Sequence, residues 1–106
     1  MALTVRTSAA AEADLEKQYE WYCRHADVDV AERYQKAFDL SVAALALHPD
    51  MGVVRNFKPQ RLRGIRSYRC EVPFDVHLVF YRADAETLFI ERVIHGARNL
   101  PRRVRE

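Results

Sequence analysis

The chain has few of the residues that interrupt or cross-link a fold. Its 106 residues include three glycines, four prolines and two cysteines. Cys23 and Cys70 form neither a CxxC pair nor a disulfide framework, so we expect two buried thiols in a cytoplasmic protein. No run approaches the roughly 18 apolar residues of a membrane span. The first residues lack the features of a signal peptide, because acidic residues begin at Glu12. We therefore expect one domain, residues 1–106, and no membrane partner.

The sequence also lacks the motifs that hold common cofactors. The glycines lie at positions 52, 64 and 96, too far apart for a phosphate-binding loop, and there is no Gly-x-Ser-x-Gly elbow. No group of His, Cys, Asp and Glu has the spacing of a metal site. We therefore expect neither a cofactor nor a metal.

Charge is nearly balanced overall but unevenly distributed along the chain. Seventeen basic side chains and fifteen acidic ones give a net charge of +2. Residues 1–50 carry five basic and nine acidic side chains, whereas residues 51–106 carry twelve basic and six acidic ones. Fourteen of the cations are arginine, which suits bidentate contacts to carboxylate or phosphate. The basic half favours an anionic partner, either a nucleic acid or an acidic protein segment; the alternative is an ordinary solvated surface.

The hydrophobic pattern of the first half predicts a strand and two helices. Residues 3–7 alternate as a short strand does, and an apolar stripe then predicts a helix over residues 8–26. A second stripe, opened by a capping box at Asp29–Glu32, predicts a helix that ends near His48. Residues 49–52 (PDMG) follow as a turn, in which the glycine supplies an unusual backbone angle.

The second half has the period of β-strands. Residues 66–72 alternate with one wet face, which includes Ser67, and residues 87–95 form the last strand. Residues 76–81 are almost wholly apolar, as in a central strand covered on both faces, so we expect His77 to be a packed residue rather than a ligand. Short turns between these segments predict an antiparallel meander. The predicted fold class is α+β, in the order β-α-α-β-β-β, with a helical hairpin packed on one face of a small antiparallel sheet.

Three local motifs, together with this element order, resemble one known family. Residues 46–52 (ALHPDMG) are similar to an L-x-x-x-P-x-x-G motif, and residues 62–68 (LRGIRSY) to an LRG-R-Y motif. Residues 90–100 (IERVIHGARNL) are similar to the ending I-x-RVLHGARD-I, with Asn99 where aspartate is usual. Over essentially its whole length the chain resembles the RelE/ParE superfamily of toxins from bacterial type II toxin–antitoxin systems, and within it the ParE-like branch.

The resemblance implies one of two activities. ParE-like members inhibit DNA gyrase by binding and are neutralised by a ParD-like antitoxin, whereas RelE-like members cleave mRNA on the ribosome without a metal. RNA cleavage needs a general base and a general acid, and arginine stays protonated. Here only His95 suits that role, because no lysine follows Lys58 and no tyrosine follows Tyr81. The ParE-like activity is therefore favoured. The alternatives are a RelE-like endoribonuclease and a non-toxic member that only binds the antitoxin.

Two sets of residues are candidates for binding. The resemblance implies that the target surface lies near the carboxyl end, at Arg92, His95, Arg98, Arg102 and Arg103. A partly disordered, acidic antitoxin segment would bind cations and exposed apolar side chains outside the stripes, for which the candidates are Trp21, Phe57, Arg63, Arg66, Arg69 and Phe74. For Arg92 the alternative is an ion pair across the sheet, and for His95 a hydrogen bond that fixes the turn. DNA would be bound only indirectly, through the antitoxin complex.

Overall fold

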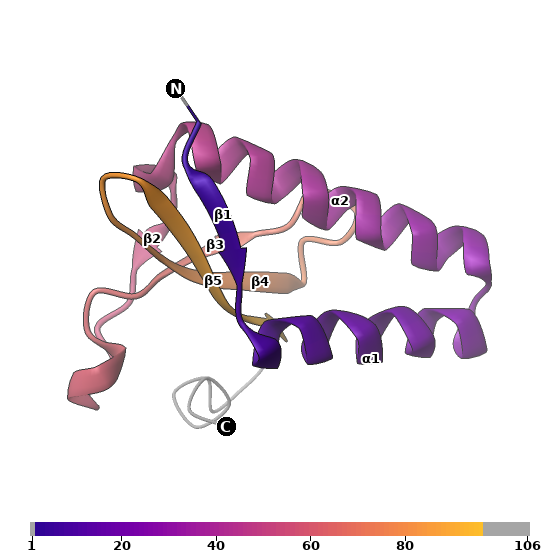
Figure 1. Ribbon diagram of the computed structural model, residues 1–106. Helices are drawn as coiled ribbons and strands as arrows, with labels where there is room; N and C mark the ends of the chain where they lie inside the picture. Colours follow the sequence, from indigo (N-terminus) through magenta and orange to yellow (C-terminus); the bar gives the residue numbers. More distant parts are fainter. Residues whose placement is uncertain (1, 97–106) are drawn as a thin grey trace.

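The computed structural model describes residues 2–96, which form a helical layer packed on a sheet (Figure 1). In chain order the elements are β1 (Thr4–Thr7), α1 (Ala9–His25), α2 (Val28–Leu47), the 3-10 turn η1 (Pro49–Met51), β2 (Val53–Val54), the 3-10 turn η2 (Gln60–Leu62), β3 (Arg66–Arg69), β4 (His77–Ala83) and β5 (Thr87–His95). The α+β class and the predicted element order are confirmed, with β2 as an additional short strand. Among these elements, neither helix is long and apolar enough to cross a membrane.

The sheet has five strands in the order β1-β5-β4-β3-β2. Strands β3, β4 and β5 form the predicted antiparallel meander. However, β1 runs parallel to β5, so the sheet is mixed rather than purely antiparallel. The direction of β1 relative to β5 depends on how the helical hairpin between them packs, which the local pattern does not report.

Polar side chains determine where the two helices begin. The Ser8 hydroxyl accepts the Ala11 N–H at 3.0 Å and opens α1. The Asp27 carboxylate accepts the Val30 N–H at 2.9 Å and opens α2, so the predicted capping box at Asp29 is wrong. Only Ala26 and Asp27 separate the two helices. This tight connection makes the antiparallel hairpin whose closed end projects past the sheet in Figure 1.

Apolar side chains cover both faces of the sheet. Val79, Tyr81 and Leu88 face the helices and are fully buried. Phe80 belongs to a second cluster on the opposite face, together with Leu62, Ile65, Leu78 and Ile94, and the segment from residue 55 to residue 65 covers it. The apolar pattern of residues 76–81 predicted that both faces of β4 are covered, which is confirmed, but it did not predict which segment covers the second face. Because the second layer comes from a loop, it has no periodic pattern to reveal it.

Strand β3 is shorter than predicted. It ends at Arg69, and Val72, which was placed in the strand, is 79% exposed. Ser67, which was placed on the wet face, is buried, and its hydroxyl accepts a hydrogen bond from Arg55 Nε at 2.6 Å. The face of β3 turned away from the helices is therefore covered by the loop that follows β2.

Candidate functional site

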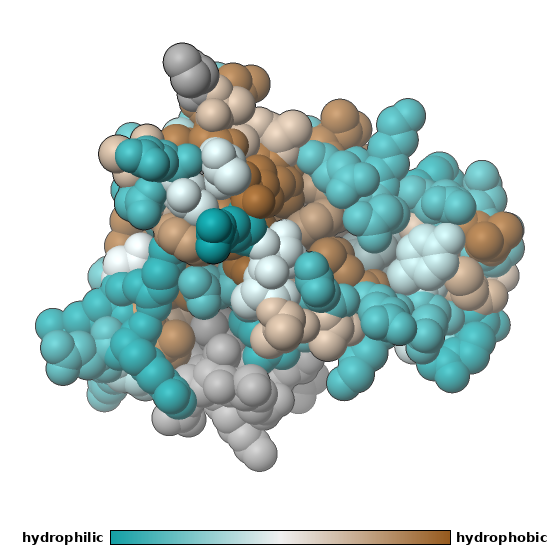
Figure 2. Space-filling view, in the orientation of Figure 1, coloured by the Kyte–Doolittle hydropathy of each residue, from teal (hydrophilic) through white to brown (hydrophobic). Residues whose placement is uncertain are grey.

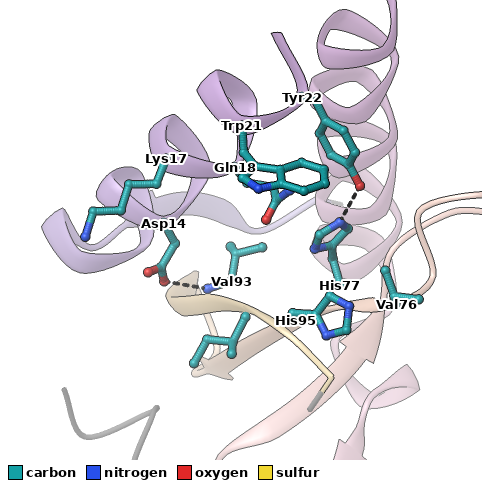
Figure 3. A pocket seen from close by; sticks show the side chains of 10 residues that line it. Asp14, Lys17, Gln18, Trp21, Tyr22, Val76, His77, Val93 and His95 are labelled. Atoms are coloured by element: carbon teal, nitrogen blue, oxygen red, sulfur yellow. Dashed lines mark hydrogen bonds between the residues drawn. The ribbon is translucent and has the colours of Figure 1, made fainter. Parts of the chain in front are cut away.

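A groove of about 460 Å³ lies between α1 and the end of β5 (Figure 3). We call it the α1–β5 groove, and its lining includes Lys17, Gln18, Trp21, Tyr22, His77 and His95. Its volume lies within the range of roughly 300–1,000 Å³ that is usual for ligand pockets. Because Lys17 and Trp21 are four residues apart in α1, they lie on the same face of the helix.

Trp21 forms the exposed apolar wall of the groove. It falls off the apolar stripe of α1, and 47% of it is exposed. Its indole stacks on the His25 ring, with 4.4 Å between centroids and 17° between planes. His25 Nδ1 lies 3.0 Å from the Trp21 carbonyl oxygen, which holds the imidazole in this stacked position. The structure thus places this predicted site residue at an open surface with a fixed ring.

His77 lies at the floor of the groove and is buried. Its Nε2 lies 2.8 Å from the Tyr22 hydroxyl (Figure 3). Its ring also packs edge-on against Tyr34. Burial, together with the nearby His95, lowers the pKa of His77 to about 4, so the ring is neutral at pH 7. The interpretation of this residue as a packed histidine is confirmed.

The neutral His77 predicts a pH-dependent stability. The folded-state pKa of about 4 lies below the ordinary value of 6.5, so between these values the unfolded chain binds more protons. This contribution to the free energy of unfolding is complete above pH 6.5 and falls by roughly 2 kcal/mol on going down to pH 4.5. Denaturant titrations at both pH values check it. The His77→Gln variant should lose less stability than the wild type over this interval, and an equal loss would contradict the assignment.

His95 lies beside His77 at the exposed end of β5. The two rings meet edge-on with 5.8 Å between centroids. His95 is exposed and therefore accessible to a partner. Arg98, Arg102 and Arg103, the other predicted target-surface residues beyond β5, lie outside the described residues.

Arg92 forms an ion pair instead of an open cationic surface. Its Nε and Nη2 both donate to the Asp14 carboxylate at 2.8 Å, and the Val93 N–H donates to the same carboxylate at 3.0 Å. The side chains of Arg92 and Asp14 are only 12% and 15% exposed. Arg92 thus forms an ion pair, which was the alternative prediction for this residue, although its partner is on α1 rather than across the sheet.

A second candidate surface lies on the opposite face of the sheet. From Met51 to Cys70 the sequence has six basic residues and no acidic one. Within this stretch we call residues 55–63 the cationic loop. Phe57 packs against Phe80, with 6.1 Å between centroids, and the Arg82 guanidinium donates to the carbonyls of Arg61 and Arg63. Figure 2 shows hydrophilic side chains gathered at the lower left, where this loop lies in Figure 1.

The predicted antitoxin-binding arginines are only partly free for a partner. The guanidinium of Arg66 donates to the Gly52 carbonyl at 2.8 Å and lies 3.6 Å from the Asp50 carboxylate. Arg69 is exposed and donates to the Asp75 carbonyl at 3.0 Å. Arg63 is exposed on the cationic loop. Arg66 thus lies on the helical face of β3 at the end of α2, whereas Arg69 lies on the face that the loop covers, so the structure does not bring the three arginines together.

Two residues differ from the sequence prediction in their burial. Phe74 was expected to be an exposed apolar contact, but only 6% of it is exposed and its ring packs edge-on against Tyr22 and Tyr34. It lies in the turn between β3 and β4, where no periodic pattern indicates which way a side chain faces. Cys23 was expected to be buried but is exposed, whereas Cys70 is buried as expected.

The two candidate surfaces lie on opposite faces of the sheet. His95 lies on the helical side, beside His77 and Tyr22. The cationic loop covers Phe80 on the other side. His95, the side chain that suits acid–base chemistry, is therefore separated from the cations of the loop and shares the α1–β5 groove with Lys17.

The comparisons with known proteins agree with this architecture. The model of the family "ParE toxin of type II toxin-antitoxin system, parDE" matches residues 5–100. The fold is similar to that of a chain from the chromosomal ParDE toxin–antitoxin system of P. aeruginosa, with a TM-score of 0.70 and 18% identity over 89% of this chain and 96% of that chain. It is also similar to a chain of the RelBE2 toxin–antitoxin complex of Mycobacterium tuberculosis, with a TM-score of 0.61 and 23% identity over 90% of this chain and 92% of that chain. No curated protein matches the sequence significantly. Because the family model spans most of the chain and the fold agrees, the chain belongs to the ParE toxin family of type II toxin–antitoxin systems.

Proposed function

We propose that the chain inhibits DNA gyrase by binding to it and that a ParD-like antitoxin neutralises this activity. The observation that carries the proposal is the match of the ParE toxin family model to residues 5–100. The proposed target surface is the exposed end of β5 and the residues after it, namely His95, Arg98, Arg102 and Arg103. Arg92 supports this surface from within, through its ion pair with Asp14.

The arrangement of the two surfaces supports inhibition by binding over RNA cleavage. A metal-independent nuclease needs an acid–base pair beside the cations that bind the scissile phosphate. In the described part of the chain His95 shares the α1–β5 groove with one lysine, Lys17, whereas the cationic loop covers the opposite side of the sheet. The RelE-like alternative would require these groups to meet at one phosphate.

The antitoxin is expected to contact both sides of the molecule. Trp21 offers an open aromatic surface on α1, and Phe57, Arg63, Arg66 and Arg69 offer apolar and cationic contacts elsewhere on the molecule. An acidic segment that folds on binding can cover these contacts, because such segments wrap large areas. We expect the chain to contact DNA only indirectly, through the antitoxin in the complex.

Purified protein should inhibit the supercoiling activity of gyrase and leave ribosome-bound mRNA intact. The triple variant Arg98→Ala, Arg102→Ala, Arg103→Ala should weaken inhibition about tenfold or more. Several charged contacts at an interface together typically contribute more than about 1 kcal/mol to the binding free energy. The matched control replaces Arg24, Arg33 and Lys36 by alanine, an equal change of charge on the helices, and should inhibit like the wild type. Codon-specific mRNA cleavage that is lost in His95→Ala would instead support the nuclease.

A further inference from the structure

The outer edge of β5 is covered by a strand for only part of its length. Strand β1 pairs with Thr87–Ile90 of β5. The chain then enters α1, and side chains at the start of this helix form hydrogen bonds with the next backbone groups of β5. The Ser8 hydroxyl donates to the Glu91 carbonyl at 2.7 Å, and Asp14 accepts the Val93 N–H. A bulge in β5 opposite Phe80 and Tyr81 shifts the register here. Beyond Val93 no strand follows within residues 2–96.

Two backbone groups at this edge lack a partner among the described residues. The Val93 N–H points outward to Asp14, and backbone groups of alternate strand residues point the same way. The Val93 carbonyl and the His95 N–H therefore also point outward, while the Gly96 N–H points inward to the Val76 carbonyl at 2.6 Å. One residue of an added parallel strand would donate to the Val93 carbonyl and accept from the His95 N–H. Edges of this kind are templates for strand addition.

The α1–β5 groove lies directly beside these two backbone groups, and its lining favours a negatively charged ligand. Asp14 is the one carboxylate in its lining, and Arg92 neutralises it. Lys17 has no acidic partner among the described residues, and the Trp21 indole N–H makes no hydrogen bond to them. The groove thus offers an ammonium group and N–H donors around an open apolar wall. A peptide that alternates apolar and acidic side chains fits these features.

We propose that an extended, acidic segment of the antitoxin adds as a strand beside Val93–His95 and places an apolar side chain against Trp21. The identity of the peptide rests on the proposed function, whereas the site rests on the unpaired edge and the groove. Backbone hydrogen bonds to Val93 and His95 fix the register of the added strand, and an acidic side chain pairs with Lys17.

Trp21 is the only tryptophan of the chain, so its fluorescence reports directly on the groove. The probes are tryptophan-free synthetic peptides of about ten residues that together cover the sequence of the cognate ParD-like antitoxin. One acidic peptide should shift the Trp21 emission to shorter wavelength and reduce quenching by iodide. In the complex of the full chain with the whole antitoxin, the His95 amide should exchange with solvent more slowly.

Two substitutions separate strand addition from side-chain contacts. The variant His95→Pro removes the outward N–H without breaking a bond of the sheet and should bind the peptide about tenfold more weakly. The control His95→Ala keeps the N–H and should bind within about threefold of the wild type. Lys17→Glu should weaken binding about tenfold at low salt and make the affinity less sensitive to salt than that of the wild type. Melting temperatures of the three variants verify that each one folds.

Several results would overturn the proposal. Full-strength antitoxin binding with unchanged Trp21 emission and an unaffected His95→Pro variant would exclude the groove but leave the proposed function intact. Failure of the antitoxin to bind the wild-type chain would overturn both. A dimer of the chain alone that His95→Pro abolishes in sedimentation would assign the edge to a second copy. If removal of residues 97–106 shifted the emission of the free chain to longer wavelength, the groove would belong to the chain's own end.

Discussion

Replacing Asp14 by alanine is expected to lower the free energy of unfolding by about 3 kcal/mol or more. The substitution removes both bonds from the Asp14 carboxylate to Arg92 and leaves the Val93 N–H without its acceptor. Because the two side chains are only 12% and 15% exposed, water replaces these bonds poorly. Denaturant unfolding of the wild type and of Asp14→Ala measures the difference.

A matched control uses the exposed ion pair between Arg33 and Asp29. Arg33 lies 3.4 Å from Asp29 within α2, and these side chains are 58% and 79% exposed. The variant Arg33→Ala should therefore change the free energy of unfolding by no more than about 0.5 kcal/mol. Equal losses in Arg33→Ala and Asp14→Ala would show that the Asp14–Arg92 pair does not hold α1 to β5. The variant Arg92→Ala breaks the same ion pair, so a loss of toxicity in this variant should be accompanied by a lower melting temperature.

Replacing Gly52 by alanine is expected to destabilise the chain by about 3 kcal/mol. A Cβ atom at this position would lie 2.6 Å from Cε1 and 2.8 Å from Cζ of Tyr81. The ring cannot retreat, because it is fully buried and its hydroxyl donates to the Pro49 carbonyl at 2.6 Å and accepts the Gly52 N–H at 2.9 Å. Thermal or denaturant unfolding of Gly52→Ala checks this effect.

Gly64→Ala distinguishes lack of space from backbone strain. Gly64 has a φ of 79°, and an added Cβ would meet nothing closer than Arg82 Nη1 at 3.9 Å. Its replacement should therefore cost only the left-handed backbone penalty of about 1–2 kcal/mol. A Gly52→Ala variant that is no less stable than Gly64→Ala would show that Tyr81 moves aside at little cost.

Gly52 shows which features a local sequence pattern can predict and which it cannot. The sequence predicts the turn at residues 49–52 correctly, but it attributes the glycine to an unusual backbone angle. Its φ is −71°, an ordinary value, and the residue is a glycine because the Tyr81 ring approaches from β4. Tyr81 is 29 positions further along the chain. No local pattern reports a contact at that separation.

In the candidate site too, local patterns predicted some features, and contacts between distant residues decided the others. The off-stripe position of Trp21 indicated an exposed side chain, and the apolar strand around His77 indicated a packed one; both predictions are confirmed. The ion pair of Arg92 was foreseen as an alternative, but not its partner, because Asp14 is 78 positions away. Phe74 was predicted to be exposed because its turn has no period, and only the packing of Tyr22 and Tyr34 shows that it is buried.

The sequence by itself determined the order of helices and strands, the helical hairpin and the division of charge between the two halves. These features depend on periodicity, caps and turns, which involve residues only a few positions apart. The tertiary structure alone decided that β1 lies parallel to β5, that the cationic loop covers the second face of the sheet, and that an unpaired edge meets α1 in a groove. Each of these features joins segments distant in the chain, and their pairing is settled by which apolar faces can be buried together.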